Sequence, residues 1–417
     1  MGSPRYCIIG AGATGLATID ALLEADLEFD CFETTDRVGG QWHTGYDALH
    51  LITPRDSSGF TGHPMPASYP LYPSRDQMRD YLLGFAATRD LVRHVTFGTT
   101  VDRIAPDGRG WLVETSDAET RRYAGVVVAN GHLRVPLQPQ LEGYTGRQLH
   151  AATYQNTADI EGTRVLVVGS GNSGCDIAVD CAQQRGLATT VSIRKGHLFQ
   201  PKTFAGKPRG ELWIMRLPPR LQDYALRAMI RIAVGRPQEY GLPAPATWRL
   251  AEQKPVVNSQ LLHWIHHGRI AVAPGVRGAD GLEVAFTDGR RETFDTIVWC
   301  TGYRVGFPFL DHGLLQWQDG VPLRTAGCVL PKRGPGRLYF VGLAAPRGPQ
   351  LSVYSRQAAL VARMLRLQER LVTPLAETFT SRGAPEGRID VVRSVWQGQM
   401  ELAEDVVTRL EAGDRAS

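Results

Sequence analysis

Several features that would place this chain in a familiar class are missing from it. No CxxC pair occurs among its six cysteines, which excludes a zinc ribbon and a thioredoxin-like dithiol, so we expect free thiols and no metal site. Only five of the 46 basic residues are lysines, and no dense basic block marks a nucleic-acid surface. No apolar run approaches the roughly 18 residues of a membrane span, and the first residues lack the layout of a secretory signal. These absences predict a cytoplasmic protein with no membrane span and no nucleic-acid partner.

What remains is the composition of a large globular protein. The chain has 417 residues, of which 43% are hydrophobic and 21% charged, with a formal net charge of +4. These values are ordinary for folded proteins and exclude a disordered chain. At roughly 150 residues per domain, the length predicts two or three domains.

One pattern of strand, glycine-rich loop and helix occurs twice. The first copy has a strand-like run at 6–9, the loop GAGATG at 10–15 and a helical stretch at 16–25; the second has a run at 164–168, the loop GSGNSG at 169–174 and a stretch at 175–184. Each copy closes with strand-like runs that end at a glycine, Gly131 and Gly302. The repeat predicts an α/β fold with two Rossmann-like dinucleotide-binding domains.

The first loop is followed by an acidic residue at the position that hydrogen-bonds to the ribose in dinucleotide-binding folds. Gly10 allows the tight turn, Gly12 lets the backbone approach a pyrophosphate, and Gly15 lets the helix pack on the strand. Glu33 ends the next strand-like run, 18 residues after Gly15, and its carboxylate would accept from a ribose 2′-hydroxyl and repel a 2′-phosphate. The pattern favours FAD or NAD over NADP, against the alternative of a glycine turn with a solvated glutamate. Gly39–Trp42 comes next, with adjacent glycines suited to a flat ring.

The second loop is followed by bases instead. Arg194 and Lys195 come 20 and 21 residues after Gly174, with no carboxylate at the strand end. A guanidinium binds the 2′-phosphate of NADPH well, whereas the alternative is a surface Arg-Lys pair. FAD together with NADPH implies hydride transfer to the flavin. A disulfide reductase would need a redox-active cysteine pair, so oxygen chemistry or another electron acceptor remains.

The segment between the two loops carries a family fingerprint. Residues 144–154, YTGRQLHAATY, resemble the F-x-G-x-x-x-H-x-x-x-(Y/F) motif of the class B flavin-dependent monooxygenases, with Tyr144 in place of the first Phe. Segments 295–303 and 338–342 look like further parts of that family, and 49–55 and 69–75 are similar to flavin-containing monooxygenases, including their plant YUCCA-type branch. The resemblance extends from about residue 6 to 365.

Two departures bear on the reaction. Ile52 stands where many N- and S-oxygenating relatives have an asparagine, although Thr53 still offers a hydroxyl. The Baeyer–Villiger branch prefers Trp followed by Pro or Asp where this chain has Tyr154-Gln155. Ester formation from ketones is therefore a less favoured alternative.

The resemblance implies an NADPH-dependent flavoprotein that forms a C4a-hydroperoxyflavin with dioxygen and inserts one oxygen atom into a small molecule, by N- or S-oxygenation. The alternatives are decarboxylating oxygenation of a 2-oxo acid, Baeyer–Villiger oxidation, and an NADPH:acceptor flavin reductase that does not oxygenate. A homodimer is also compatible with the sequence, which does not fix the oligomeric state.

The same resemblance assigns domains and contacts. We expect residues 1–160 to form the first part of an FAD-binding domain, 161–295 an inserted NADPH-binding domain with a helical insertion near 201–255 (helix at 221–234), and 296–417 the return to the FAD domain with C-terminal helices, ending in 389–410. The pocket is expected from 53–65, 201–255 and 343–354.

No catalytic side chain is assigned beyond the candidates Thr53 and His150, and His43, His132 and Arg55 are read as structural or cofactor-contacting. FAD contacts are expected from Gly10, Gly12, Ala13, Thr14, Gly15, Glu33, Gly40, Gln41, Trp42, Thr53, Val101, Gly131 and Gly342; NADPH contacts from Gly146, His150, Gly169, Ser170, Gly171, Asn172, Ser173, Gly174, Arg194, Lys195, Thr301, Gly302 and Tyr303.

Overall fold

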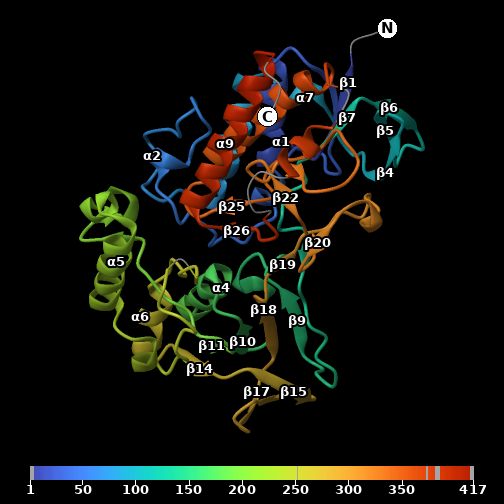
Figure 1. Ribbon diagram of the computed structural model, residues 1–417. Coiled ribbons are helices and arrows are strands. Elements are labelled where there is room, and N and C mark those ends of the chain that lie inside the picture. Colours follow the sequence, from blue (N-terminus) through green and yellow to red (C-terminus); the bar gives the residue numbers. More distant parts are fainter. Residues whose placement is uncertain (1–3, 251, 372–373, 381–385, 414–417) are drawn as a thin grey trace.

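Two parallel five-stranded sheets form the framework of the chain (Figure 1). The computed structural model describes residues 4–250, 252–371, 374–380 and 386–413. The predicted α/β fold with two Rossmann-like units is confirmed, because both sheets have the strand order that the repeated sequence pattern requires.

The first sheet has the order β24-β7-β1-β2-β3. Its central strand β1 (Arg5–Ile9) is buried over four of five residues and pairs in parallel with β2 (Glu28–Phe32) and β7 (Gly125–Val128). The outer strands are β24 (Leu338–Phe340) and β3 (Val95–Thr96). Helices α1 (Ala13–Glu24) and α7 (Leu351–Gln368) pack together, and α9 (Arg393–Glu411) packs on α7 (Figure 1).

The second sheet repeats this arrangement with the order β14-β11-β10-β18-β9. Strand β10 (Arg164–Val168) lies between β11 (Ala188–Ser192) and β18 (Thr296–Trp299). The outer strands are β14 (Ile270–Ala273) and β9 (Arg147–His150). Helix α4 (Asn172–Gln183) packs against this sheet and against α6 (Gln260–His266).

A small antiparallel sheet precedes the closing strand of each unit, so the internal repeat is longer than the glycine loops alone. β4 (Val101–Asp107), β5 (Gly110–Thr115) and β6 (Thr120–Tyr123) come before β7. β15 (Val276–Asp280), β16 (Glu283–Phe286) and β17 (Arg291–Thr293) come before β18.

The chain enters and leaves the second sheet at one place. Strand β8 (Val135–Pro136) pairs antiparallel with β19 (Tyr303–Arg304), and the Leu137 amide donates to the Gly302 carbonyl at 2.9 Å. All five strands of the second sheet lie between these residues. The predicted boundaries after 160 and after 295 fall inside this stretch and would separate β9 and β18 from the sheet to which they hydrogen-bond.

The insertion at 201–255 has a small apolar core of its own. Its helix α5 (Pro219–Val234) begins two residues before the predicted start and buries Leu226 and Ile230. The short strands β12 (Thr203–Phe204) and β13 (Lys207–Pro208) form a hairpin. The C-terminal stretch predicted as helical at 389–410 begins with strand β26 (Asp390–Val391), and its helix is α9.

Shorter segments complete the fold. Helix α3 (Arg75–Thr88) starts at a capping box: the Ser74 hydroxyl accepts from the Gln77 amide, and the Gln77 side chain accepts from the Ser74 amide. The others are α2 (Arg55–Ser58), α8 (Leu375–Thr380), β20 (Trp317–Gln318), β21 (Val321–Pro322), β22 (Arg324–Thr325), β23 (Leu330–Pro331) and β25 (Ala345–Pro346).

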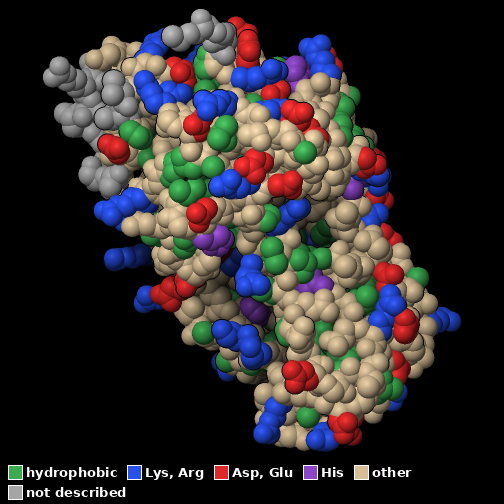
Figure 2. All heavy atoms as spheres, turned by 90° about the vertical axis from the view of Figure 1, so that its right-hand side faces the viewer, with side chains coloured by type: hydrophobic (Ala, Val, Ile, Leu, Met, Phe, Trp, Pro, Cys, Tyr) green, Lys and Arg blue, Asp and Glu red, His purple; other side chains and the backbone are tan. Residues whose placement is uncertain are grey.

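The space-filling view shows two lobes with a hollow between them, and Lys, Arg and His side chains gather there (Figure 2). Among the residues that the structure describes, no helix combines the length and the apolar character of a membrane span. In the same part of the chain, no three His, Cys, Asp or Glu side chains gather as metal ligands would. All six cysteines carry free thiols.

Candidate cofactor and active site

The first glycine loop has the shape of a phosphate cradle. Gly10 has φ +99°, which favours glycine, and a Cβ on Gly15 would lie 2.0 Å from the Gly10 carbonyl oxygen. Gly12 is different, because a Cβ there would meet nothing nearer than Gly40, at 3.8 Å. Gly10 and Gly15 are therefore required by packing, whereas Gly12 leaves open backbone in front of α1. No side chain in the described part of the chain caps that helix, so its amides are available to a phosphate.

The second loop has nearly the same geometry. Gly169 has φ +115°, and a Cβ on Gly174 would lie 2.0 Å from the Gly169 carbonyl oxygen. A Cβ on Gly171 would meet nothing within 4 Å, and α4 also begins without a side-chain cap. The Ser170 hydroxyl beside it is buried and has no hydrogen-bond partner among the described residues. Both loops thus fit a pyrophosphate.

The strand ends differ between the two units. The Gly10 amide donates to the Phe32 carbonyl at 2.8 Å and the Gly169 amide to the Ser192 carbonyl at 3.0 Å, so Glu33 corresponds in position to Ile193, just before Arg194. The Glu33 carboxylate is buried and accepts from the Ala11 amide at 2.7 Å and from the amide and hydroxyl of Thr35. Arg194 and Lys195 are exposed, and neither forms an ion pair with any described residue. The Glu33 carboxylate is thus fixed beside its loop, whereas Arg194 and Lys195 are free to bind a ligand.

The segment Gly39–Trp42 lies against the first loop. The Gly39 amide donates to the Ala11 carbonyl at 3.0 Å, and Gly40, with φ +57°, faces Gly12. The turn η1 (Gly40–Trp42) leaves Gln41 exposed and packs the half-buried Trp42 against the main core. Two glycines facing each other leave room for a ligand to approach both backbones.

The far end of this cradle is closed by Gly342. A Cβ there would lie 2.1 Å from the Thr14 side chain, and the Gly342 amide donates to Gln357 at 3.0 Å. The Thr14 hydroxyl donates to the Ala129 carbonyl at 2.7 Å, two residues before Gly131. His132 Nδ1 lies 3.1 Å from the Gly342 carbonyl oxygen, and burial lowers the pKa of His132. The predicted FAD contacts at Thr14, Gly131 and Gly342 are thus brought together.

The fingerprint residues gather where the chain crosses between the sheets. His150 ends β9 opposite Trp299, is 2% exposed, and meets the Tyr303 ring edge-on at 5.1 Å. Burial lowers the pKa of His150, which keeps the ring neutral. Packing requires glycine at position 146, since a Cβ there would lie 2.5 Å from the Tyr144 hydroxyl. The Thr301 hydroxyl donates to the Leu137 carbonyl beside this crossing.

Three predicted site residues have their groups engaged within the protein. The Thr53 hydroxyl lies 2.8 Å from the Ser58 hydroxyl. Val101 is buried in the apolar cluster behind the first sheet, so a cofactor contact from it would have to come from its backbone. Asn172 Oδ1 accepts from the Val257 amide at 3.1 Å.

A buried polar group that the sequence motifs did not reveal joins the two units. Asp176 on α4 accepts from the Tyr46 hydroxyl at 3.0 Å and from the Asn258 amide group at 2.8 Å. Burial raises the pKa of Asp176, and the charges of His50 and Lys202 oppose this. The available signal was a carboxylate inside the otherwise apolar run 175–179.

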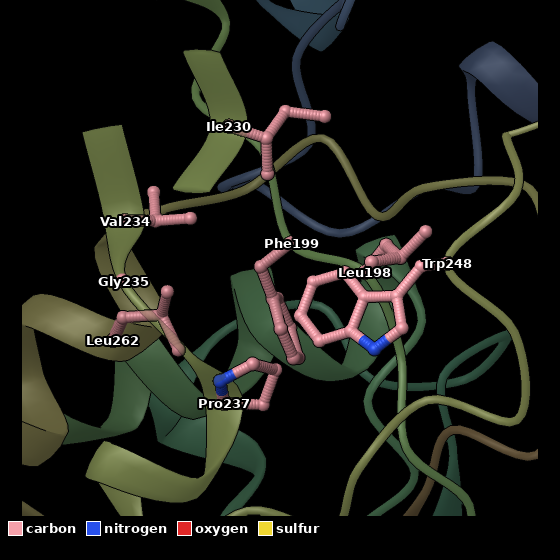
Figure 3. A pocket seen from close by; sticks show the side chains of 8 residues that line it. All are labelled: Leu198, Phe199, Ile230, Val234, Gly235, Pro237, Trp248 and Leu262. Atoms are coloured by element: carbon pink, nitrogen blue, oxygen red, sulfur yellow. The ribbon is translucent and has the colours of Figure 1, made fainter. Parts of the chain in front are cut away.

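The role of the insertion as a wall of the substrate pocket stays a prediction from the sequence. A cavity of about 10 Å³ under α5 has room for roughly one water molecule (Figure 3). It is too small for a substrate. Its lining, into which Phe199 and Trp248 project, is Leu198, Phe199, Ile230, Val234, Gly235, Pro237, Trp248 and Leu262.

Comparison with known proteins decides the family. The model of the flavin-binding monooxygenase-like family matches residues 3–381. The chain belongs to this family. A relative from rice, indole-3-pyruvate monooxygenase YUCCA1, is 31% identical over 357 residues, which cover 81% of this chain and 86% of the relative. Rat flavin-containing monooxygenase 3 is 29% identical over 400 residues, which cover 87% of this chain and 74% of the relative.

Solved structures agree in fold with this flavin-binding monooxygenase. A flavin-containing monooxygenase from Stenotrophomonas maltophilia has a TM-score of 0.65 at 22% identity, covering 88% of this chain and 99% of that one. The open form of a cyclohexanone monooxygenase has a TM-score of 0.72 at 19% identity, covering 97% and 98%. The predicted family, the enzyme class and the use of FAD and NADPH are confirmed.

Proposed function

We propose that this flavin-binding monooxygenase transfers one oxygen atom from dioxygen to a nitrogen or sulfur atom of a small molecule. In the overall reaction, substrate, O₂, NADPH and H⁺ give oxygenated substrate, NADP⁺ and water. The observation that carries this proposal is the pair of uncapped glycine loops, one followed by Glu33 and the other by Arg194. The flavin-containing monooxygenases among its relatives support N- or S-oxygenation.

The proposed cofactor contacts lie along the two loops. FAD would be held by Gly10–Gly15, the Glu33 carboxylate, Gly40–Trp42 and the backbone near Gly131 and Gly342. NADPH would be held by Gly169–Gly174 and by Arg194, with Gly146, His150 and Thr301–Tyr303 beside its nicotinamide. The orphaned Ser170 hydroxyl is a donor for a phosphate oxygen.

When bound, FAD supplies the hydride acceptor and the oxygen-activating chemistry. The protein's own side chains have other tasks. A neutral, buried His150 against Tyr303 orients the crossing without adding charge, and His132 fixes the Gly342 turn. Half-buried Trp42 shields one side from water.

A second reaction is favoured by one relative. YUCCA1 of rice is an indole-3-pyruvate monooxygenase by name and is 31% identical. The corresponding reaction would convert a 2-oxo acid, O₂, NADPH and H⁺ into the shortened carboxylic acid, CO₂, NADP⁺ and water. The Baeyer–Villiger alternative is supported by a shared fold alone.

The test is reduction of the protein by NADPH without oxygen, then rapid mixing with oxygenated buffer while the absorbance of the flavin is recorded. A transient absorbance that matches neither oxidised nor reduced flavin, with product formed from amines, thioethers or 2-oxo acids, supports oxygenation. Direct reoxidation with stoichiometric hydrogen peroxide in the presence of all three substrate classes would instead support the NADPH:acceptor reductase. A homodimer and a cytoplasmic location stay predictions from the sequence.

A further inference from the structure

A cluster of basic side chains lies where the insertion meets the C-terminal part of the chain. Arg347, directly after β25, donates from Nη1 to the Leu250 carbonyl of the insertion. Its Nε and Nη2 donate to Asp390 at 3.2 and 2.7 Å. Lys254 Nζ lies 3.9 Å from the same carboxylate. One acid therefore serves two cations that come from different segments.

Two further arginines have no acid of their own. Arg209 begins the turn η4 (Arg209–Glu211) and is half-buried, and its side chain makes no hydrogen bond or ion pair with the described part of the chain. Arg393 donates to the Pro349 carbonyl at 2.9 Å and pairs with no described carboxylate. Glu211 is exposed and is joined to neither. Leu212, three residues after Arg209, packs in the same apolar core as Leu250, whose carbonyl Arg347 binds. The turn that carries Arg209 thus lies beside the segment whose two cations share Asp390.

Such a cluster favours an incoming anion. Burial and the charge of Arg347 both lower the pKa of Arg209, yet a guanidinium stays protonated. A half-buried, unpaired charge is costly, and a bound anion removes that cost. The planar guanidinium fork matches a carboxylate, to which it can donate two parallel hydrogen bonds.

The cluster lies near the proposed flavin end of the site. Arg347 comes five residues after Gly342, a path of at most roughly 17 Å. The Gly342 carbonyl contacts His132, and the charge of Lys254 contributes to the lowered pKa of that histidine. Arg209 and Arg347 also fall in two of the segments, 201–255 and 343–354, from which the sequence predicts the pocket.

Building on the proposed function, we propose that Arg209 and Arg347 bind a carboxylate of the substrate. This monooxygenase then acts on small molecules that carry a carboxylate beside the atom to be oxidised. A phosphate of NADPH is the other source of such an anion. The second glycine loop and Arg194 already offer phosphate contacts, which favours the substrate.

The experiment compares two thioethers with the same sulfur, 3-(methylthio)propanoate and its neutral amide. Sulfoxide formation is measured with the FAD-loaded wild type and with Arg209→Gln, Arg209→Lys and Arg216→Gln, the last being an exposed arginine of the same insertion. Arg209→Gln should lower kcat/KM for the propanoate about tenfold or more and leave the amide and the KM for NADPH within about twofold. Arg209→Lys should recover part of the loss, and Arg216→Gln should change nothing.

Other results overturn the carboxylate site. An equal loss for propanoate and amide would mean a structural role, and a raised KM for NADPH would assign Arg209 to the cofactor. If neither thioether is oxidised, the flavin difference spectrum on adding propanoate gives a readout without turnover. Binding that Arg209→Gln abolishes supports the site even if the proposed reaction fails; no binding, or binding that Arg209→Gln leaves unchanged, overturns it. Failure of the proposed function is separate, namely no oxygenated product from any substrate class.

Discussion

The two glycine loops have nearly the same internal contacts but differ in the side chains at the ends of their second strands. In each loop, a Cβ on the third glycine would lie 2.0 Å from the carbonyl oxygen of the first, whereas a Cβ on the middle glycine would meet no described atom nearer than 3.8 Å. After the first loop the buried Glu33 is bound to the loop backbone, whereas after the second loop Arg194 stands exposed. Packing therefore sets the shape of a dinucleotide loop, and one strand-end side chain is left to choose the nucleotide.

A second difference lies inside the helices. Asp176 occupies on α4 the place that Ala17 occupies on α1, two residues after the third glycine. Ala17 packs in an apolar core, but Asp176 binds Tyr46 and Asn258. The second unit is thus tied to the segment after Gly40 by a polar contact that has no counterpart in the first.

The largest effect is expected where the two loops are most alike. Gly15→Ala and Gly174→Ala each press a Cβ against a backbone carbonyl and should cost more than about 3 kcal/mol locally. Gly15→Ala should yield protein without FAD, and Gly174→Ala yellow protein that NADPH reduces at least about 100-fold more slowly. Flavin content after purification and anaerobic reduction rates check this. Retention of FAD by Gly15→Ala would contradict the claim that the third glycine is required for the shape of the loop.

The middle glycines separate ligand binding from folding. Gly12 and Gly171 have φ of −70° and −69°, which alanine adopts freely, and their surroundings are open. Gly171→Ala should change the unfolding free energy by less than about 0.5 kcal/mol and raise the KM for NADPH about tenfold or more. Gly12→Ala should weaken FAD instead. Thermal melts of the FAD-free proteins, in parallel with kinetics, check both, and a large loss of stability would contradict the packing argument.

Arg194→Gln tests the strand-end difference. Loss of a charge-assisted pair with the 2′-phosphate, worth about 1.5–3 kcal/mol, should raise the KM for NADPH roughly 10- to 100-fold. The KM for NADH should stay within about twofold, because NADH has no such phosphate. Exposed Arg304 offers a control as Arg304→Gln, which should leave both values unchanged. Equal losses for NADPH and NADH would remove Arg194 from nucleotide choice.

Asp176→Asn should have the smallest effect, and it depends on pH. Burial raises the pKa of Asp176, so the folded protein binds this proton more tightly than the unfolded one. The wild type should therefore lose stability as the pH rises from about 4, the unfolded value, through the folded pKa. The asparagine variant should lack that loss, and its Tm relative to wild type should rise by a few degrees between pH 4 and pH 7. A pH-independent difference in Tm would show that the carboxylate does not titrate as expected.

Much of the fold was predictable because its signals are local. The glycine loops, the strands before them, Glu33 and Arg194 all lie within about 35 residues of one another in each unit, and periodicity reveals them. The helix in the insertion was found for the same reason, with an error of two residues at its start.

The remainder depends on contacts between distant segments. Tyr46 and Asp176 are 130 positions apart, and Asn258 and Asp176 are 82 apart, so no spacing rule joins them. Strand β9 precedes the second glycine loop in sequence, and only its hydrogen bonding to β18 reveals that it completes this sheet. Arg209 and Arg347 are likewise 138 positions apart, and only the fold brings their segments together.

The hydrogen bond between the Leu137 amide and the Gly302 carbonyl has a consequence for how such a protein can arise. The whole second sheet is formed by one continuous segment of chain, and the two ends of that segment are hydrogen-bonded neighbours. A segment of this kind can be added to a smaller one-sheet ancestor, or exchanged for another, without moving the strands that come before and after it. The ability to recruit a second nucleotide is thereby separated from the architecture that holds the first.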